Sequence, residues 1–324
     1  MSDDPLVSVI IPYYNPRADF MKQAIDSVLH QTYQAFEVLL IDDGSGPESA
    51  AVATEYAERF PTQVRIYYHS GRQNRGSSAS RTLGLQYARG KYVAFLDADD
   101  IWLAEKLKDQ VALLEAHPEA AMLYGNTLYW HRWAGNESDL QLDYMPRLNL
   151  QTEKVYQPPS LLPLYLEGKT AVPCTCSLIV RCQAVEDIGG FEDAFPGMYD
   201  DQVFYAKISL EAPIYVSSRC WDQYRQHAGS MSAFSRNNSM QWATRLVFLE
   251  WLEGYLTTKG VHDPEIWQAL RRAMWLNRNP NYPFLSETGR MAIRRSKKWL
   301  LKFEEWLLPV PIRRQIWARE FKPE

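Results

Sequence analysis

"KYVAFLDADD", residues 91–100, joins an apolar run directly to a cluster of acidic residues. The apolar part is typical of a buried strand in a parallel sheet. Asp97, Asp99 and Asp100 then follow within four positions. Ionised carboxylates are rarely buried without a partner, so this cluster either caps a helix or forms a cation site at the end of the strand.

Similar apolar runs occur upstream of this segment, and amphipathic stretches separate them. We predict parallel strands at residues 6–12, 36–41, 64–69 and 91–96. The intervening helices are predicted around Phe20, Ala24 and Val28, then at 47–60 and 77–88. Strands that alternate with helices are typical of an α/β fold. The pattern therefore predicts a Rossmann-like, mostly parallel sheet with helices on both faces.

The remaining chain is less regular. We predict a helix at 104–120, an aromatic strand or loop at 121–133, a proline-interrupted irregular stretch at 138–172, a strand at 174–181, a turn at 185–193 and a helix at 200–210. From residue 239 the pattern is helical. We expect one domain over residues 1–236, with halves of about 1–101 and 102–236, and a helical C-terminal extension over 237–324.

Composition narrows the class of protein. The chain has 324 residues, 46% hydrophobic content and a formal net charge of -4, which gives no indication of nucleic-acid binding. The N-terminus is acidic where a signal peptide would be basic, and no apolar run approaches the roughly 18 residues of a membrane span. We therefore expect a cytoplasmic protein. The four cysteines lack zinc-site spacing and are expected to be reduced.

Acidic residues end two of the predicted strands. Asp42 and Asp43 follow the second strand, and the cluster beginning at Asp97 follows the fourth. Either pair alone could simply cap a helix. Because the carboxyl ends of parallel strands share one edge, we expect both to border one crevice with Pro12–Asn15. Carboxylates suit Mg²⁺ or Mn²⁺, and substrate phosphates complete the shell of such an ion. A nucleoside diphosphate would fit this crevice.

The ordered motifs resemble the family-2 glycosyltransferases, which are nucleotide-sugar enzymes with a GT-A fold. The segments that carry the resemblance are VSVIIPYYN, DDGS, NRGSSASR, FLDADD, GGFED, the pair Asp200-Asp201, and YRQH followed by Gly229 and Ser230. They span about residues 6–235. One such motif would be weak evidence for the family, but the ordered series of motifs is specific to it.

The resemblance implies a nucleotide site. Its residues would be Pro12, Tyr13, Asn15, Asp42, Asp43, Gly76, Arg81, Asp97, Ala98 and Arg225. Asp42 or Asp43 would contact the base or ribose, and Asp97 would lie near the ribose. Asp99 would bind Mn²⁺ or Mg²⁺. His227 is either a second ligand or a histidine hydrogen-bonded beneath the site, and Asp100 is expected to cap a helix near Trp102.

The resemblance also implies the chemistry. Asp201 would be the general base that deprotonates an acceptor hydroxyl, with Asp200 as the alternative. One base opposite the leaving group implies a single displacement with inversion at the anomeric carbon. Two positions depart from the family pattern. Ser80-Arg81-Thr82 replaces the usual Ala-Arg-Asn, and Asp200-Asp201-Gln202 replaces Glu-Asp followed by an aromatic residue.

The implied activity is transfer of a hexosyl or N-acetylhexosaminyl group from a nucleotide sugar, most simply a UDP-sugar, to a glycan or lipid-linked acceptor in cell-surface or exopolysaccharide synthesis. The alternative is a catalytically silent relative that binds a glycan or a partner protein. Trp130, His131 and Trp133 either stack on an acceptor sugar or pack in the core. The basic, aromatic segment 285–324 either contacts the inner face of the plasma membrane or packs on the catalytic domain.

Overall fold

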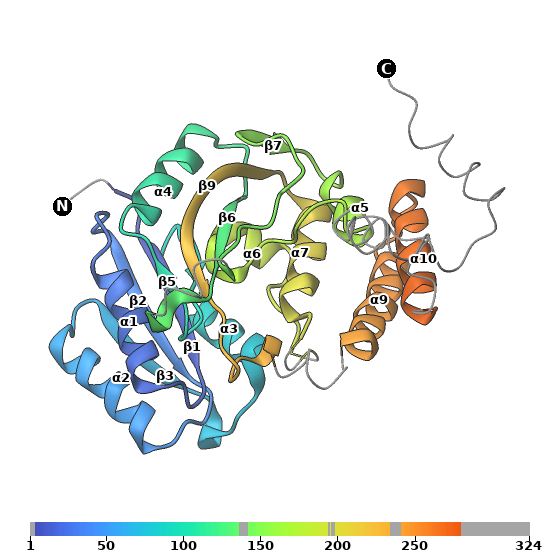
Figure 1. Cartoon of the computed structure of the whole chain (residues 1–324). Coiled ribbons are helices and arrows are strands. Elements are labelled where there is room, and N and C mark those ends of the chain that lie inside the picture. The colour runs from blue at the N-terminus through green and yellow to red at the C-terminus, as the bar shows by residue number, and fades with distance from the viewer. Residues whose placement is uncertain (1–3, 136–141, 194, 196–197, 234–240, 280–324) are drawn as a thin grey trace, which may run out of the picture. The chain divides into compact units, whose positions relative to one another are not determined.

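The computed structural model describes residues 4–135, 142–193, 195, 198–233 and 241–279 (Figure 1). The chain divides into two compact units, Met1–Met274 and Trp275–Glu324. Only residues 275–279 of the second unit are described, so the following description concerns the first. Segment 285–324 and the expected domain boundary at residue 236 lie outside the described residues.

The N-terminal half is built on parallel strands, as predicted. They are β1 (Val7–Tyr13), β2 (Phe36–Asp42), β3 (Val64–Tyr68) and β4 (Tyr92–Phe95). Their order in the sheet is β3-β2-β1-β4, and each neighbouring pair is parallel. Every residue of β2 is buried, which explains its continuous apolar sequence. All four strands end at the same edge of the sheet.

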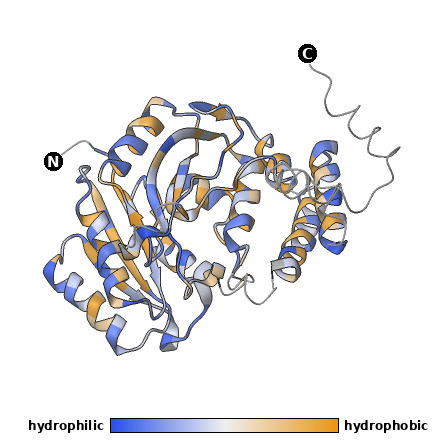
Figure 2. Ribbon diagram, viewed as in Figure 1, coloured by the Kyte–Doolittle hydropathy of each residue, from blue (hydrophilic) through white to orange (hydrophobic). Residues whose placement is uncertain are grey.

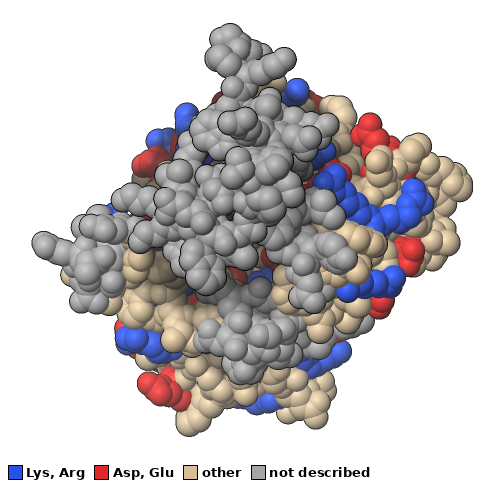
Figure 3. Space-filling view, turned by 45° about the vertical axis from the view of Figure 1, so that its right-hand side comes forward, with Lys and Arg blue, Asp and Glu red and all other residues tan. Residues whose placement is uncertain are grey.

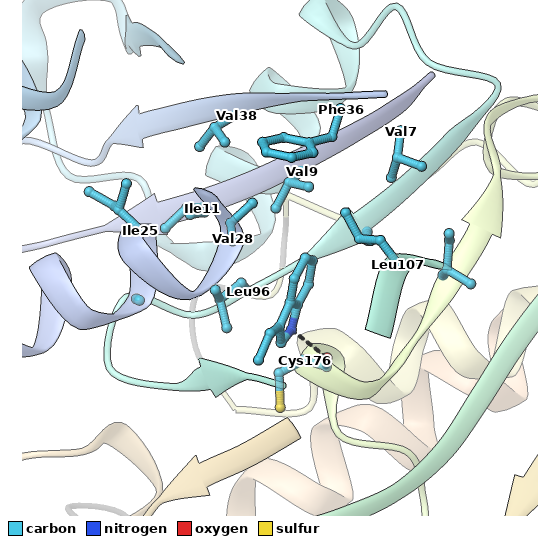
Figure 4. Close-up of a cluster of buried hydrophobic side chains, with 14 of the residues drawn as sticks. Val7, Val9, Ile11, Ile25, Val28, Phe36, Val38, Leu96, Leu107 and Cys176 are labelled. Atoms are coloured by element: carbon cyan, nitrogen blue, oxygen red, sulfur yellow. Dashed lines mark hydrogen bonds between the residues drawn. The ribbon is translucent and has the colours of Figure 1, made fainter. Parts of the chain in front are cut away.

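Helices cover both faces of this sheet. They are α1 (Ala18–Leu29), α2 (Pro47–Arg59), α3 (Gly76–Tyr87) and α4 (Lys106–Ala116). Alternate residues of β1 point to opposite faces, so Val9 and Ile11 join one core and Ile10 joins the other. Figure 4 shows Ile25 and Val28 of α1 beside the first of these sets, and Figure 2 shows the hydrophobic colouring of the central strands.

The C-terminal half extends the sheet with mixed pairing. Its strands are β5 (Ile101–Trp102), β6 (Met122–Trp130), β7 (Lys154–Tyr156), β8 (Ile179–Arg181) and β9 (Ile214–Arg225). The long β6–β9 pairing is parallel, whereas β8 pairs with β4 and β6 in short antiparallel segments. The longest pairings in the sheet are therefore parallel, with antiparallel strands beside them.

Further helices complete the unit. They are α5 (Leu161–Leu166), α6 (Cys182–Asp187), α7 (Asp200–Glu211), α9 (Gln241–Thr258) and α10 (Pro264–Arg278). A third core contains buried residues of α5, α7, α9 and the described first-unit part of α10. On the face shown in Figure 3, acidic and basic side chains of the described residues are interspersed. No helix among the described residues is long and apolar enough to cross a membrane.

Several local predictions were wrong. The stretch 138–172 contains β7 and α5, and the predicted turn at 185–193 begins inside α6. Asp100 does not cap a helix at Trp102, because Ile101–Trp102 is strand β5 and α4 begins only at Lys106. The Asp100 carboxylate instead accepts a hydrogen bond from the backbone N–H of Arg225, at 2.8 Å. That partner is remote in sequence, so local patterns could not identify it.

Candidate active site

A cleft of about 1140 Å³ lies at the carboxyl edge of the parallel strands. Twelve of the predicted site residues line it, namely Pro12, Tyr13, Asn15, Asp43, Gly76, Arg81, Asp97, Ala98, Asp99, Asp200, Asp201 and His227. They come from the ends of β1, β2 and β4, the first half of α3, the start of α7 and the segment after β9. Asp42 and Arg225 do not line it.

Asn15 and Asp43 shape the first part of the cleft. Asn15 has a φ of 45°, and its side-chain oxygen accepts a hydrogen bond from the backbone N–H of Gly46 at 2.7 Å. Asp43 accepts bonds from the backbone N–H groups of Arg75 and Gly76 at 2.7 and 2.9 Å. These bonds connect the β1 and β2 ends to the start of α3. Of the two candidates after β2, only Asp43 faces the cleft.

His69 is a site-adjacent residue that the sequence did not reveal. Its Nε2 lies 3.5 Å from a carboxylate oxygen of Asp43 and 3.0 Å from the hydroxyl oxygen of Ser80. His69 is buried beneath the cleft at the end of β3. No acidic neighbour in sequence indicated this contact, because Asp43 approaches from the adjacent strand.

Arg81 connects the two halves of the cleft. Its guanidinium is buried and donates through Nη1 to Asp200 and through Nη2 to Asp97, both at 2.7 Å. Ser77 also donates its hydroxyl to Asp200, at 2.5 Å. Ser77 was not predicted as a site residue, although it lies in the NRGSSASR motif. The same Asp200 oxygen therefore accepts two hydrogen bonds from side chains of α3, and these bonds connect the start of α7 to α3.

Asp201 has a different environment from Asp200. Burial and the neighbouring charge of Asp200 raise the pKa of Asp201 to about 7, and the positive charge of Arg81 opposes that rise. Its carboxylate accepts a bond from the backbone N–H of Gln202 at 2.7 Å. A carboxyl group with a pKa near neutrality can accept and release protons under ordinary conditions, as a general base must.

Asp99 and His227 form a second pair of side chains in the cleft. A carboxylate oxygen of Asp99 lies 2.9 Å from Nε2 of His227, and both residues line the cleft. No group of three or more His, Cys, Asp or Glu side chains with metal-site geometry occurs among the described residues. A hard divalent cation can nevertheless be held by one or two protein ligands together with substrate phosphates. The Asp99–His227 pair fits that arrangement.

Arg225, which the resemblance assigns to the nucleotide site, does not line the cleft. Its side chain is 1% exposed and lies over the rings of Phe20 and Trp130, 4.1 and 4.8 Å from their centres. Its Nε donates to the backbone carbonyl of Asp99 at 2.7 Å, and its Nη2 donates to Gln23 at 2.8 Å. The Arg225 side chain therefore holds the backbone at Asp99 and does not itself line the cleft.

The predicted aromatic acceptor residues separate in the structure. Trp130 packs on Arg225 outside the cleft, whereas Trp133 lines the cleft and donates its indole N–H to the carbonyl of Gln226 at 2.8 Å. His131 does not line the cleft. Tyr129 and Tyr224, which were not predicted, do line it, with ring centres 5.1 Å apart.

The sequence is also similar to known proteins. The family model described as "Glycosyl transferase family 2" matches residues 8–189. An uncharacterized glycosyltransferase of Rickettsia felis is 29% identical over 255 residues, which are 75% of this chain and 38% of that protein. The Escherichia coli protein named UDP-Glc:alpha-D-GlcNAc-diphosphoundecaprenol beta-1,3-glucosyltransferase WfgD is 36% identical over 124 residues, 38% of this chain and 46% of WfgD. The chain thus spans less than half the length of these two relatives.

Solved structures show the same fold. S. aureus TarS 1-349 in complex with UDP-GlcNAc matches with a TM-score of 0.54 and 22% identity, covering 70% of this chain and 60% of TarS. The mannosyltransferase PcManGT of Pyrobaculum calidifontis, in complex with GDP-Man and Mn²⁺, matches with a TM-score of 0.55 and 18% identity, covering 96% of this chain and 83% of PcManGT. These similarities confirm the predicted GT-A fold.

Proposed function

Because the chain belongs to glycosyl transferase family 2, we propose that it transfers a sugar from a nucleotide-sugar donor to an acceptor hydroxyl with inversion at the anomeric carbon. The observation that carries this proposal is the placement of Asp201 in the same cleft as Asp99 and His227. Asp201, with a pKa of about 7, would act as the base, and Asp99 and His227 would be the ligands of a diphosphate-bound cation.

The donor would lie along the strand ends. Tyr13 and Asp43 would border the nucleoside, and Asp97, held by Arg81, would border the ribose. Asp99 and His227 would hold Mn²⁺ or Mg²⁺, which when bound neutralises charge on the departing diphosphate. We favour a UDP-sugar because the names of WfgD and of the TarS complexes contain UDP-Glc, UDP and UDP-GlcNAc.

Asp201 would accept the proton of the acceptor hydroxyl as that oxygen attacks the anomeric carbon. The carbon–oxygen bond to the nucleoside diphosphate breaks in the same step. Asp200 is less suited to this role, because one of its oxygens already accepts bonds from Arg81 and Ser77. One base that acts opposite the leaving group produces inversion.

The acceptor would be a glycan or a lipid-linked sugar, as the name of WfgD suggests. Such a substrate would place the protein at the inner face of the plasma membrane, in cell-surface polysaccharide synthesis. Liposome co-sedimentation of the chain with and without residues 285–324 tests the membrane contact. Equal pelleting of both forms would contradict it.

The activity is tested by incubating the protein with UDP-, GDP- and dTDP-sugars and following nucleoside diphosphate release with Mn²⁺ or with EDTA. We expect UDP release that depends on the metal and that Asp201→Asn and Asp99→Asn each reduce. Binding of UDP without turnover of any donor, even with added acceptor glycans, would favour the silent relative. NMR of the product should show the inverted anomer, and a retained anomer would exclude the one-step mechanism.

A further inference from the structure

The residue that precedes the Asp200-Asp201 pair has an uncommon backbone conformation. Tyr199 has a φ of 69° and a ψ of 6°, in the left-handed region. A bulky non-glycine residue adopts this region at a cost of about 1–3 kcal/mol and keeps it only when its surroundings impose it. Because Tyr199 immediately precedes α7, its backbone sets the direction in which Asp200 and Asp201 leave the loop.

A ring contact with α9 holds Tyr199 in place. The Tyr199 ring stacks on Phe248, with ring centres 5.7 Å apart and planes 13° from parallel. One helical turn further along α9, the ring of Trp251 lies nearly perpendicular to that of Phe195, with ring centres 5.7 Å apart. Residues three apart lie on the same face of a helix, so one face of α9 contacts two positions of the segment before α7.

Asp201 depends on this support more than Asp200 does. Arg81 and Ser77 hold the Asp200 side chain from α3. Among the described residues, the Asp201 carboxylate has one hydrogen bond, which comes from the N–H of its own neighbour Gln202. The orientation of Asp201 therefore follows the backbone of the first turn of α7, which Tyr199 immediately precedes.

We propose that Tyr199 and Phe248 form a positioning pair, through which helix α9 fixes the orientation of Asp201 in the cleft. Tyr199 lines the cleft itself, but Phe248 is buried and does not line it. Phe248 is therefore a positioning residue that acts through Tyr199. The role rests on the proposed function of Asp201 as general base, and it makes the helical C-terminal region part of the transferase machinery.

The test compares two alanine substitutions on the same helix. Phe248→Ala removes the ring beneath Tyr199, whereas Leu256→Ala removes a similarly buried side chain two turns away. We expect Phe248→Ala to lower kcat for UDP-sugar turnover about 10- to 100-fold, because a displacement near 1 Å at a reacting group can cost about 100-fold. The Kd for UDP with Mn²⁺ should stay within about twofold of the wild-type value, since the residues proposed to bind the nucleotide sugar lie on other elements. Leu256→Ala should change neither quantity beyond twofold.

Two further measurements keep the test decisive. Phe248→Leu retains apolar volume but loses the flat ring, so it should lower kcat even if Phe248→Ala folds poorly. In a double-mutant cycle, Tyr199→Ala combined with Phe248→Ala should lose no more activity than the worse single variant. If the activity losses of the two single variants multiply in the double variant, the positioning role is overturned. Equal kcat values for Phe248→Ala and Leu256→Ala would also overturn it. An inactive wild-type protein would instead overturn the proposed function.

Discussion

Two adjacent carboxylates at the start of α7 have different environments. Asp200 is bound by Arg81 and Ser77, whereas burial and the charge of Asp200 raise the pKa of Asp201 to about 7. Environments that separate the behaviour of paired acids are typical of acid–base sites. The position of Asp201 within the motif favoured it as the base, but the sequence could not reveal the partners of Asp200, because Arg81 lies on a helix more than a hundred residues away.

Asp201→Asn should lose activity and gain stability at alkaline pH. The native pKa of about 7 exceeds the ordinary value of 3.8, so the native state holds this proton more tightly than the unfolded state does. The contribution of the Asp201 carboxyl group to the free energy of unfolding of the wild type therefore falls as pH rises from about 4 to 7. Urea unfolding should show Asp201→Asn gaining stability relative to wild type between pH 5 and pH 8. Activity of the variant should fall about 100- to 10,000-fold.

The pH dependence of the wild-type enzyme provides an independent check on Asp201. Because the base must be deprotonated, kcat/KM should rise as pH increases through about 7. If kcat/KM falls instead at an acid limb centred near pH 4, the raised pKa of Asp201 is contradicted. A stability difference between Asp201→Asn and wild type that stays constant from pH 5 to pH 8 would contradict it as well.

Arg81→Gln should be strongly destabilising. The substitution leaves buried Asp200 and partly exposed Asp97 without their shared partner, and loss of one member of a buried ion pair, here Arg81–Asp200, typically costs about 3–5 kcal/mol. Arg17→Gln is the matched control, because its pair with Asp19 is exposed on both sides and such pairs contribute about 0–1 kcal/mol. If both variants change the free energy of unfolding by the same amount, the ion pairs of Arg81 contribute no more stability than the exposed pair of Arg17.

At the scale of elements, strand β9 supports the cleft from behind. Its last residue, Arg225, holds the Asp99 carbonyl, and the backbone N–H of Arg225 holds Asp100. These bonds replace the helix cap that the sequence predicted for Asp100. The prediction failed because β9 pairs with β5 directly after the aspartates, and strand pairing between distant segments has no local sequence signal.

Close packing of α3 on β1 allows a paired test of glycine substitutions. A Cβ added at Gly84 would lie 2.6 Å from the side chain of buried Ile10, so Gly84→Ala should destabilise the fold by about 1–3 kcal/mol. Gly254 of α9 has nothing within 4 Å of its added Cβ, so Gly254→Ala should stabilise by about 0.5–1 kcal/mol through helix propensity. Chemical denaturation of both variants should show opposite signs, and a shared sign would contradict this account of the packing.

At the scale of the whole molecule, the cleft joins residues from both halves of the first unit. Asp43 and Asp99 come from the parallel half, whereas Asp201 and His227 follow much later in the chain. The unfolded chain cannot reproduce this arrangement, so a ligand of the cleft should bind only the native state. Binding of the proposed nucleotide should therefore raise the global stability of the protein.

UDP with Mn²⁺ should raise the melting temperature in a concentration-dependent way. At a hundredfold excess over Kd, the expected stabilisation is about 2.7 kcal/mol. EDTA should remove most of the shift, and Asp99→Asn should remove its dependence on the metal while the variant keeps a folded baseline. An equal shift in EDTA would show that Asp99 and His227 hold no ion under the diphosphate.

The sequence alone determined the parallel strands, the helices between them and the acidic strand ends, because continuous apolar runs and helical periodicity are local properties of the chain. It also supported the family and its ordered motifs. Tertiary structure decided which carboxylates share Arg81, that Arg225 lies behind the cleft, and that α9 supports Tyr199. These outcomes depend on contacts between segments far apart in sequence, and only folding brings their charges and rings within reach of one another.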